Sequence, residues 1–209
     1  MILSKLAVDA DTGKIVHPKS QQLFEVDHAN MKVVGEPQPM AGPMDPELEE
    51  ARSALEAAME QYVDAQYQED TAASAVYAVN GELRVVVSGE KLNLRNFWSG
   101  LFVSTWTVKP ASLAVAGEIK VRAHYFEDGN VQLQTKKAVA EASVSGDLAS
   151  AVRDFIAGEE KTLQEGLELM YANMTDETFK AMRRVMPVHR NKMTWNINEV
   201  KSRMQLGKK

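Results

Sequence analysis

The feature that most constrains the fold of this chain is a dipeptide, Asn80-Gly81, between two segments in which apolar and polar residues alternate. The alternation runs over residues 75–79 before the dipeptide and over residues 83–87 after it. A period of two is typical of a β-strand, and Asn-Gly is favoured in two-residue turns because both turn residues need a positive φ. The sequence therefore predicts an antiparallel β-hairpin at this point.

Further alternating segments follow and extend this hairpin into a meander. They cover residues 97–109, 113–126 and 131–136, and Asp128-Gly129-Asn130 would close the last hairpin. In the segment 113–126, Val115, Ile119, Val121, Ala123 and Tyr125 would face one side of the sheet, whereas Lys120, Arg122 and His124 would face the other. We expect five antiparallel strands with one apolar face that must be covered.

Two helical segments flank the predicted strands. The first begins at Asp45, a good N-cap, with Pro46 in its first turn, and should run to about Gln66. Its apolar stripe is made of Leu48, Ala51, Leu55, Ala58, Met59 and Tyr62.

The second helical segment, residues 147–173, is long enough to cover the sheet. Its apolar residues recur at helical spacing. Gly158 and Gly166 lie within it, and we expect them where the helix backbone approaches the sheet closely. The fold class is therefore α+β, a five-stranded antiparallel meander covered by a long C-terminal helix.

The N-terminal region carries weaker signals. Residues 1–30 are predicted to form a small hairpin, with a turn at residues 9–14. Residues 34–46 are rich in proline and glycine and are predicted to be a linker or surface loop.

Composition and motifs argue against an enzyme. The chain has no cysteine, which excludes disulfides and thiolate-bound metals, and its four histidines are scattered. Residues 9–14 begin like a calcium loop, but Lys14 stands where the loop glycine is required, so a plain turn is expected. No cofactor is predicted. With no apolar run that could cross a membrane and no secretory signal, the chain is predicted to be cytoplasmic.

The C-terminal end of the chain is strongly basic. Residues 178–209 hold nine basic side chains and one acidic one, Glu199, although the net charge of the whole chain is −5. Residues 175–178 look like a helix start and Pro187 like its end. Phe179, Met182 and Met186 would share an apolar face, which leaves the basic side chains exposed and available to an acidic partner.

The residues alone leave several interpretations of this basic segment open. Its cations could simply form the solvated face of a surface helix. They could bind nucleic acid, with Trp195 stacking on a base, although the acidity of the rest of the chain argues against this. They could also bind anionic phosphoinositides at a membrane surface.

Three stretches together resemble the α-subunit of the F-actin capping protein. Residues 96–100 read Asn-Phe-Trp-Ser-Gly, similar to Asn-Phe-Trp-Asn-Gly in the family, with a second tryptophan following at Trp106. Residues 124–133 read His-Tyr-Phe-Glu-Asp-Gly-Asn-Val-Gln-Leu, where the family has Tyr as the third residue. Residues 179–184 read Phe-Lys-Ala-Met-Arg-Arg, and Pro187-Val188 and Trp195-Asn196 follow as in the family.

The resemblance implies a barbed-end capping protein that is not an enzyme and belongs to the actin cytoskeleton. It implies a single domain over residues 1–195, made of a hairpin and linker (1–44), a helix (45–68), the sheet (72–137) and the long and basic helices (147–195). A mobile C-terminal tentacle, residues 196–209, would follow. In the family, two such sheets join into one of ten strands, so the partner would be a β-subunit or a second copy of this chain.

The resemblance also implies which residues bind actin. Basic residues at the root of the tentacle would make the first electrostatic contact, and the amphipathic tip would add a second. These residues are Lys180, Arg183, Arg184, Arg190, Lys192, Ile197, Val200, Lys201 and Met204. Overlapping residues would bind anionic phosphoinositides, and no nucleic acid is expected.

Two departures from the family pattern stand out. The chain is interpreted as a short, divergent member without the N-terminal helical stalk, which makes a homodimer through the sheet edge a serious alternative to pairing with a β-subunit. Leu101-Phe102-Val103 also replaces the family's Arg-Trp-Arg. The loss of two positive charges there predicts an apolar patch that could serve as an interface.

Overall fold

The structure is a computed structural model that describes residues 5–9, 12–20, 22–30, 32–39, 45–68, 71–95, 97–126 and 131–173 of the 209-residue chain. The chain divides into two compact units, Met1–Glu160 and Lys161–Lys209. The predicted basic helix and tentacle fall outside the described residues, so the domain boundary at residue 195 stays a prediction.

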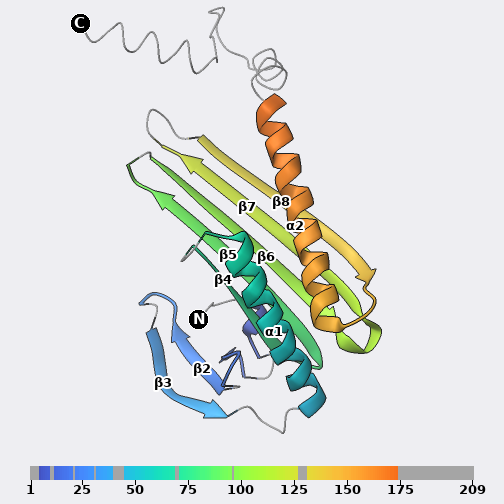
Figure 1. Ribbon diagram of the computed structural model, residues 1–209. Coiled ribbons are helices and arrows are strands. Elements are labelled where there is room, and N and C mark those ends of the chain that lie inside the picture. The colour runs from blue at the N-terminus through green and yellow to red at the C-terminus, as the bar shows by residue number, and fades with distance from the viewer. Residues whose placement is uncertain are drawn as a thin grey trace, which may run out of the picture. The chain divides into compact units, whose positions relative to one another are not determined.

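A five-stranded antiparallel sheet forms the centre of the first unit (Figure 1). Its strands follow one another in chain order: β4 (Ala72–Val79), β5 (Glu82–Asn93), β6 (Trp98–Lys109), β7 (Ala114–Tyr125) and β8 (Val131–Ser143). Asn80 and Gly81 have φ values of 55° and 76°, as the predicted turn requires. The predicted meander and the α+β fold class are confirmed.

The last strand is longer than the alternation predicts, because β8 continues past Lys136 to Ser143. The added part contains several alanines, which have little β-propensity of their own. It is held by its partner strand instead, with Ala138 opposite Glu118 and Val139 opposite Gly117. Tertiary pairing therefore extends the strand beyond what the local sequence indicates.

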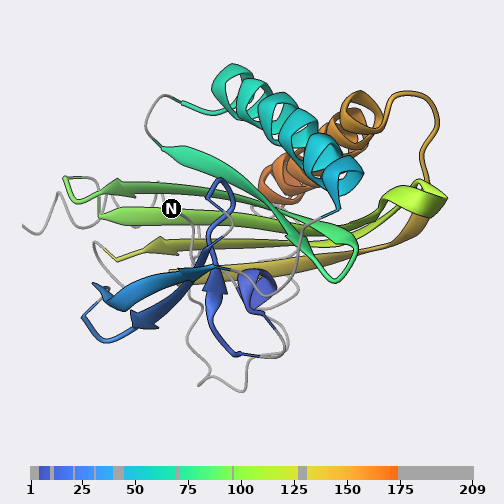
Figure 2. The same ribbon diagram turned by 90° about the horizontal axis from the view of Figure 1, so that it is seen from below.

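Two helices lie on one face of this sheet, as Figure 2 shows for α1 (Pro46–Gln66) and the first part of α2 (Leu148–Asn173). The α1 N-cap is confirmed, since the Asp45 side chain accepts a hydrogen bond from the Glu47 backbone N–H at 3.0 Å. Asp147 does the same for α2, accepting from the Ser150 N–H at 3.0 Å.

The core on this side is built around Trp106, which is fully buried. Its ring meets the Phe155 ring of α2 edge to face, with centroids 6.0 Å apart. Gly117 on the neighbouring strand lies directly beneath it, and a Cβ added there would overlap the indole. The close approach predicted for Gly158 is wrong, because a Cβ added there would meet no atom within 4 Å apart from the backbone of its own helix.

The N-terminal region forms a three-stranded sheet and not only a single hairpin, although Val8 and Ile15 bridge across the predicted turn. Its strands are β1 (Ile15–Val16), β2 (Gln22–Asp27) and β3 (Lys32–Pro39), and a short 3-10 turn, η1 (Lys5–Ala7), precedes them. The prediction that residues 34–46 are only a linker is therefore wrong over β3. Proline is tolerated there because β3 is an edge strand whose outer N–H groups need no partner within the sheet.

This small sheet lies on the face of the five-stranded sheet opposite the helices (Figure 2). Ala7 and Ile15 join a buried cluster with Ala75, Tyr77 and Val86, which project from β4 and β5. The Arg84 guanidinium also donates to the Leu6 carbonyl at 3.0 Å. The helix-free face is thus covered over β4 and β5.

Candidate functional site

All the residues predicted to bind actin lie in the segment 174–209, outside the described residues. They are Lys180, Arg183, Arg184, Arg190, Lys192, Ile197, Val200, Lys201 and Met204. Their roles stay a prediction. The structure describes α2, the element that leads into this segment, and the side chains that hold its first half.

A buried carboxylate fixes the end of the first half of α2. Glu160 is only 2% exposed. One of its oxygens accepts hydrogen bonds from the hydroxyls of Tyr62 and Tyr67 at 2.6 and 2.8 Å, and the other accepts from the Ser104 hydroxyl at 2.6 Å. The Trp106 indole N–H donates to the same Ser104 oxygen at 3.0 Å. These five side chains, named here the Glu160 cluster, join α1, β6 and α2.

The cluster is arranged to hold its members in place. Burial raises the pKa of both Tyr62 and Tyr67, and the nearby Glu160 raises it further. The phenols therefore remain protonated donors well above neutral pH. Glu160 is the last residue of the first unit. The cluster therefore anchors α2 just before the second unit begins at Lys161.

Sequence reasoning missed this cluster, although a signal was present. Glu160 follows Val152 and Ile156 at intervals of four, so it occupies an apolar-stripe position of the helix. A carboxylate on a buried stripe needs several hydrogen-bond donors. Tyr62 of α1 and Tyr67, the C-cap of that helix, are residues of the right type to supply them.

A second buried polar group ties α1 to the sheet. Arg52 is 3% exposed and binds Glu49 at 2.7 Å and Glu56 at 2.8 Å. It also reaches the Val76 carbonyl at 3.4 Å. The hydrogen bonding that Arg52 donates to the Glu49 carboxylate is the largest cause of the raised pKa of Arg52. The predicted stripe of α1 is therefore interrupted by two ion pairs that hold the helix against the sheet.

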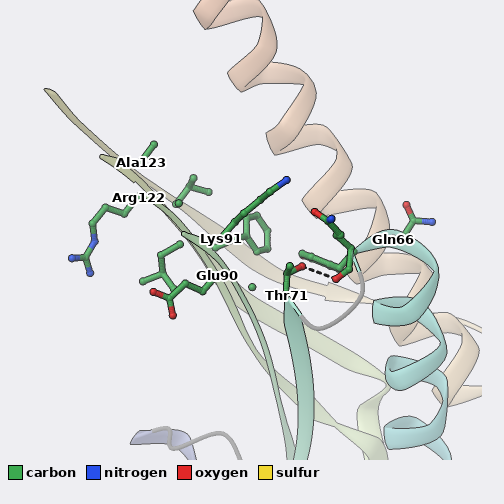
Figure 3. Close-up of a pocket in the computed structure, with 13 residues that line it drawn as sticks. Gln66, Thr71, Glu90, Lys91, Arg122 and Ala123 are labelled. Atoms are coloured by element: carbon green, nitrogen blue, oxygen red, sulfur yellow. Dashed lines mark hydrogen bonds between the residues drawn. The ribbon is translucent and has the colours of Figure 1, made fainter. Parts of the chain in front are cut away.

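A hollow of about 330 Å³ opens where α1 ends (Figure 3). Phe102 forms part of its wall and lies 6.1 Å from Tyr67, measured between ring centroids. Figure 3 shows Lys91 pointing toward the helix side, whereas Glu90 and Arg122 point to the other side of the sheet. Its lining lacks paired carboxylates and histidines, so the hollow offers space for a side chain and not a catalytic constellation.

The predicted apolar patch at residues 101–103 is divided between the two faces. Phe102 lies on the helix side, near Tyr67. Leu101 and Val103 lie on the helix-free side, where Leu101 is opposite Arg122 and Val103 is opposite Lys120. Strand alternation separates neighbouring residues in this way, so only Leu101 and Val103 share a surface.

The described residues contain no group of three or more His, Asp or Glu side chains placed to hold a metal ion. None of the helices in the described part of the chain is both long and apolar enough to span a bilayer.

The chain matches the family model described as F-actin capping protein alpha subunit over residues 1–206. The match includes the segment that carries the predicted actin-binding residues.

Individual relatives agree with this match. The F-actin-capping protein subunit alpha of Caenorhabditis elegans is 33% identical over 198 residues, which are 90% of this chain and 69% of that protein. The Dictyostelium discoideum protein of the same name is 34% identical with the same coverage. Among solved structures, the homodimeric actin capping protein alpha subunit from Plasmodium berghei aligns with a TM-score of 0.64 and 25% identity, over 91% of this chain and 75% of that one.

Proposed function

Because the chain belongs to the F-actin capping protein alpha subunit family, we propose that it caps the barbed ends of actin filaments as one half of a dimer. The observation that carries the proposal is the family match, which extends over the fold and the basic segment together. The activity is binding alone: the bound dimer blocks both the addition and the loss of actin subunits. The protein would accordingly act at the actin cytoskeleton.

The basic segment supplies the contact with actin in this proposal. Lys180, Arg184 and Arg190 would steer the encounter with an acidic filament end and then form charge-assisted hydrogen bonds, worth about 1.5–3 kcal/mol each. Ile197, Val200 and Met204 would add apolar contacts after the encounter. The strong charge polarity of the chain supports this division of roles.

A second copy of the chain is the partner that we propose. β8 is an edge strand of thirteen residues, and such an edge is a template for pairing with another strand. In the second half of α2, Leu163, Leu167 and Met170 are only partly buried and Leu169 is 65% exposed, so apolar surface remains available. The Plasmodium berghei relative, described as homodimeric, favours a second copy over a β-subunit.

The proposal is tested by elongation of pyrene-labelled actin from filament seeds. The molar mass of the chain in solution is first measured by light scattering, both for the chain alone and for its mixture with a capping protein β-subunit. Inhibition by the chain alone, at twice the chain mass, supports a homodimeric capping protein. Inhibition only in the presence of the β-subunit would replace the second copy by that partner. The absence of inhibition in both mixtures would overturn the proposed function.

A further inference from the structure

The helix-free face of the five-stranded sheet is covered over β4 and β5, whereas no described element covers it over β6, β7 and β8. Val86 of β5 is 2% exposed under the N-terminal sheet. Farther along the same face, Leu101 and Val103 are partly exposed, and Lys120, Arg122 and Lys136 are exposed. The open part of this face therefore combines apolar and basic side chains.

A hollow of about 380 Å³ lies on this open face. Two rows of facing residues surround it, and the strand register sets them side by side. Leu101, Arg122 and Gln134 form one row, and Val103, Lys120 and Lys136 form the next. In each row the apolar side chain comes from β6, and the polar ones come from β7 and β8. The hollow thus has an apolar side and a basic side.

The basic side carries more positive charge than its neighbours neutralise. Glu118 forms ion pairs with both Lys120 and Lys136, and the hydrogen bond from Lys120 is the largest cause of its lowered pKa. One carboxylate cannot neutralise two ammonium groups. Within the described residues the Arg122 guanidinium has no ion-pair or hydrogen-bond partner, and its planar fork of N–H groups can bind a carboxylate through two parallel hydrogen bonds.

We propose that this face docks an acidic segment of a partner protein, with one apolar side chain seated between Leu101 and Val103. The acidic groups would bind Arg122, Lys120 and Lys136. Glu90 of β5 lies opposite Leu101 on the same face, beyond the hollow, and repels acids from that side. The segment is therefore oriented with its acids over β7 and β8 and its apolar residue over β6. This inference does not depend on capping.

The apolar side of the hollow is a departure of this chain from the pattern that it resembles. Arginines at positions 101 and 103 would fill the hollow with two further cations, which would attract any anion without selecting an apolar group. Leucine and valine leave space and an apolar wall instead. Specificity for an acidic segment with an apolar anchor follows from this pair of residues.

The test uses fluorescence anisotropy of the full chain with a labelled peptide of Asp and Glu residues around one central Leu. Two control peptides replace the acids by Asn and Gln, or the central Leu by Gly. Each change should weaken binding about tenfold, a loss that corresponds to about 1.4 kcal/mol. Arg122→Glu should weaken binding of the first peptide by at least as much, whereas Arg95→Glu, an equal charge reversal away from the hollow, should leave it unchanged.

The double variant Leu101→Arg/Val103→Arg separates the anchor from simple attraction of charge. It should still bind the acidic peptides but no longer distinguish central Leu from central Gly. The proposal is overturned if the wild-type chain does not bind the first peptide at low salt, or if it binds the peptides with central Leu and central Gly equally well. It is also overturned if Arg95→Glu and Arg122→Glu lose affinity equally. If the peptide converts a dimer into monomers in light scattering, the occupant is a second copy and not an acidic partner.

Discussion

Glu160 accepts a hydrogen bond of 2.6 Å from Ser104, and both side chains are buried. This contact joins the last residue of the first unit to the middle strand of the sheet. Hydrogen bonds to a carboxylate contribute about 1.5–3 kcal/mol, against about 0.5–1.5 kcal/mol between neutral groups. The position of the first half of α2 on the sheet therefore depends on a carboxylate at residue 160.

The first prediction concerns Glu160→Gln. The amide keeps the size of the side chain but weakens the hydrogen bonds that residue 160 accepts from Ser104, Tyr62 and Tyr67. The free energy of unfolding should therefore fall by about 1–3 kcal/mol. Urea denaturation at a fixed protein concentration measures this, because dimer formation makes stability depend on concentration.

Glu159→Gln is the matched control for this prediction. Glu159 pairs with Lys137 at 2.7 Å, but both side chains are partly exposed, so the loss should be no more than about 1 kcal/mol. Equal losses in the two variants would contradict the role assigned to Glu160.

The second prediction concerns alkaline pH. Burial, and then Glu160, raises the pKa of Tyr62 and Tyr67 above the ordinary value of 10.0 that applies in the unfolded chain. The stability that the two phenols contribute is complete below pH 10.0 and is lost as the pH rises above it, because the unfolded chain then releases protons that the folded chain keeps.

Urea midpoints between about pH 9 and pH 11 measure this slope. Tyr62→Phe/Tyr67→Phe should lower stability at neutral pH and flatten the decline above pH 10.0. The stability of this double variant should still decline somewhat above pH 10.0, because burial also raises the pKa of Tyr77 to about 12. An alkaline slope as steep as that of the wild-type chain would disprove the assignment.

Local patterns in the sequence predict most of the central fold. The Asn80-Gly81 turn, the alternation along β7 and the Asp45 cap each act through neighbouring residues, and all three are confirmed. The end of β8 and the course of β3 are missed, because both depend on a neighbouring strand rather than on local propensity.

The sites were less accessible to prediction from sequence. The Glu160 cluster assembles side chains from residues 62 to 160, and periodicity alone does not reveal such a contact. The division of residues 101–103 between two faces follows from simple alternation and could have been predicted. The nine predicted actin-binding residues rest on the resemblance and lie outside the described residues.

The third prediction compares two glycines. Gly117→Ala places a methyl group against the Trp106 ring and should lower the free energy of unfolding by about 1–3 kcal/mol, the usual cost of overpacking a core. Gly158→Ala has open space around its Cβ and should instead stabilise α2 by about 0.5–1 kcal/mol. Thermal unfolding of both variants measures the difference, and a reversed order would show that Trp106 does not pack on Gly117 as described.

The fourth prediction concerns the basic segment. Lys180→Ala/Arg184→Ala/Arg190→Ala should abolish barbed-end binding without reducing stability, because these cations are proposed to contact actin and not the core. Lys120→Ala/Arg122→Ala/Lys136→Ala removes the same charge from the sheet face and is the matched control. It should cap like the wild-type chain in seeded elongation. Capping by the first triple variant at the wild-type concentration would refute the assignment of those residues.

Direct imaging of growing filaments tests the central claim, that this chain caps barbed ends. The purified chain is first shown by light scattering to have the mass of a dimer. It is then added to single actin filaments with distinguishable ends, which are followed by fluorescence microscopy. We predict that the fast-growing barbed end stops abruptly and stays at constant length while the pointed end continues to grow. Unchanged growth at the barbed end, at a concentration where the dimer is intact and with the β-subunit also supplied, would contradict the account.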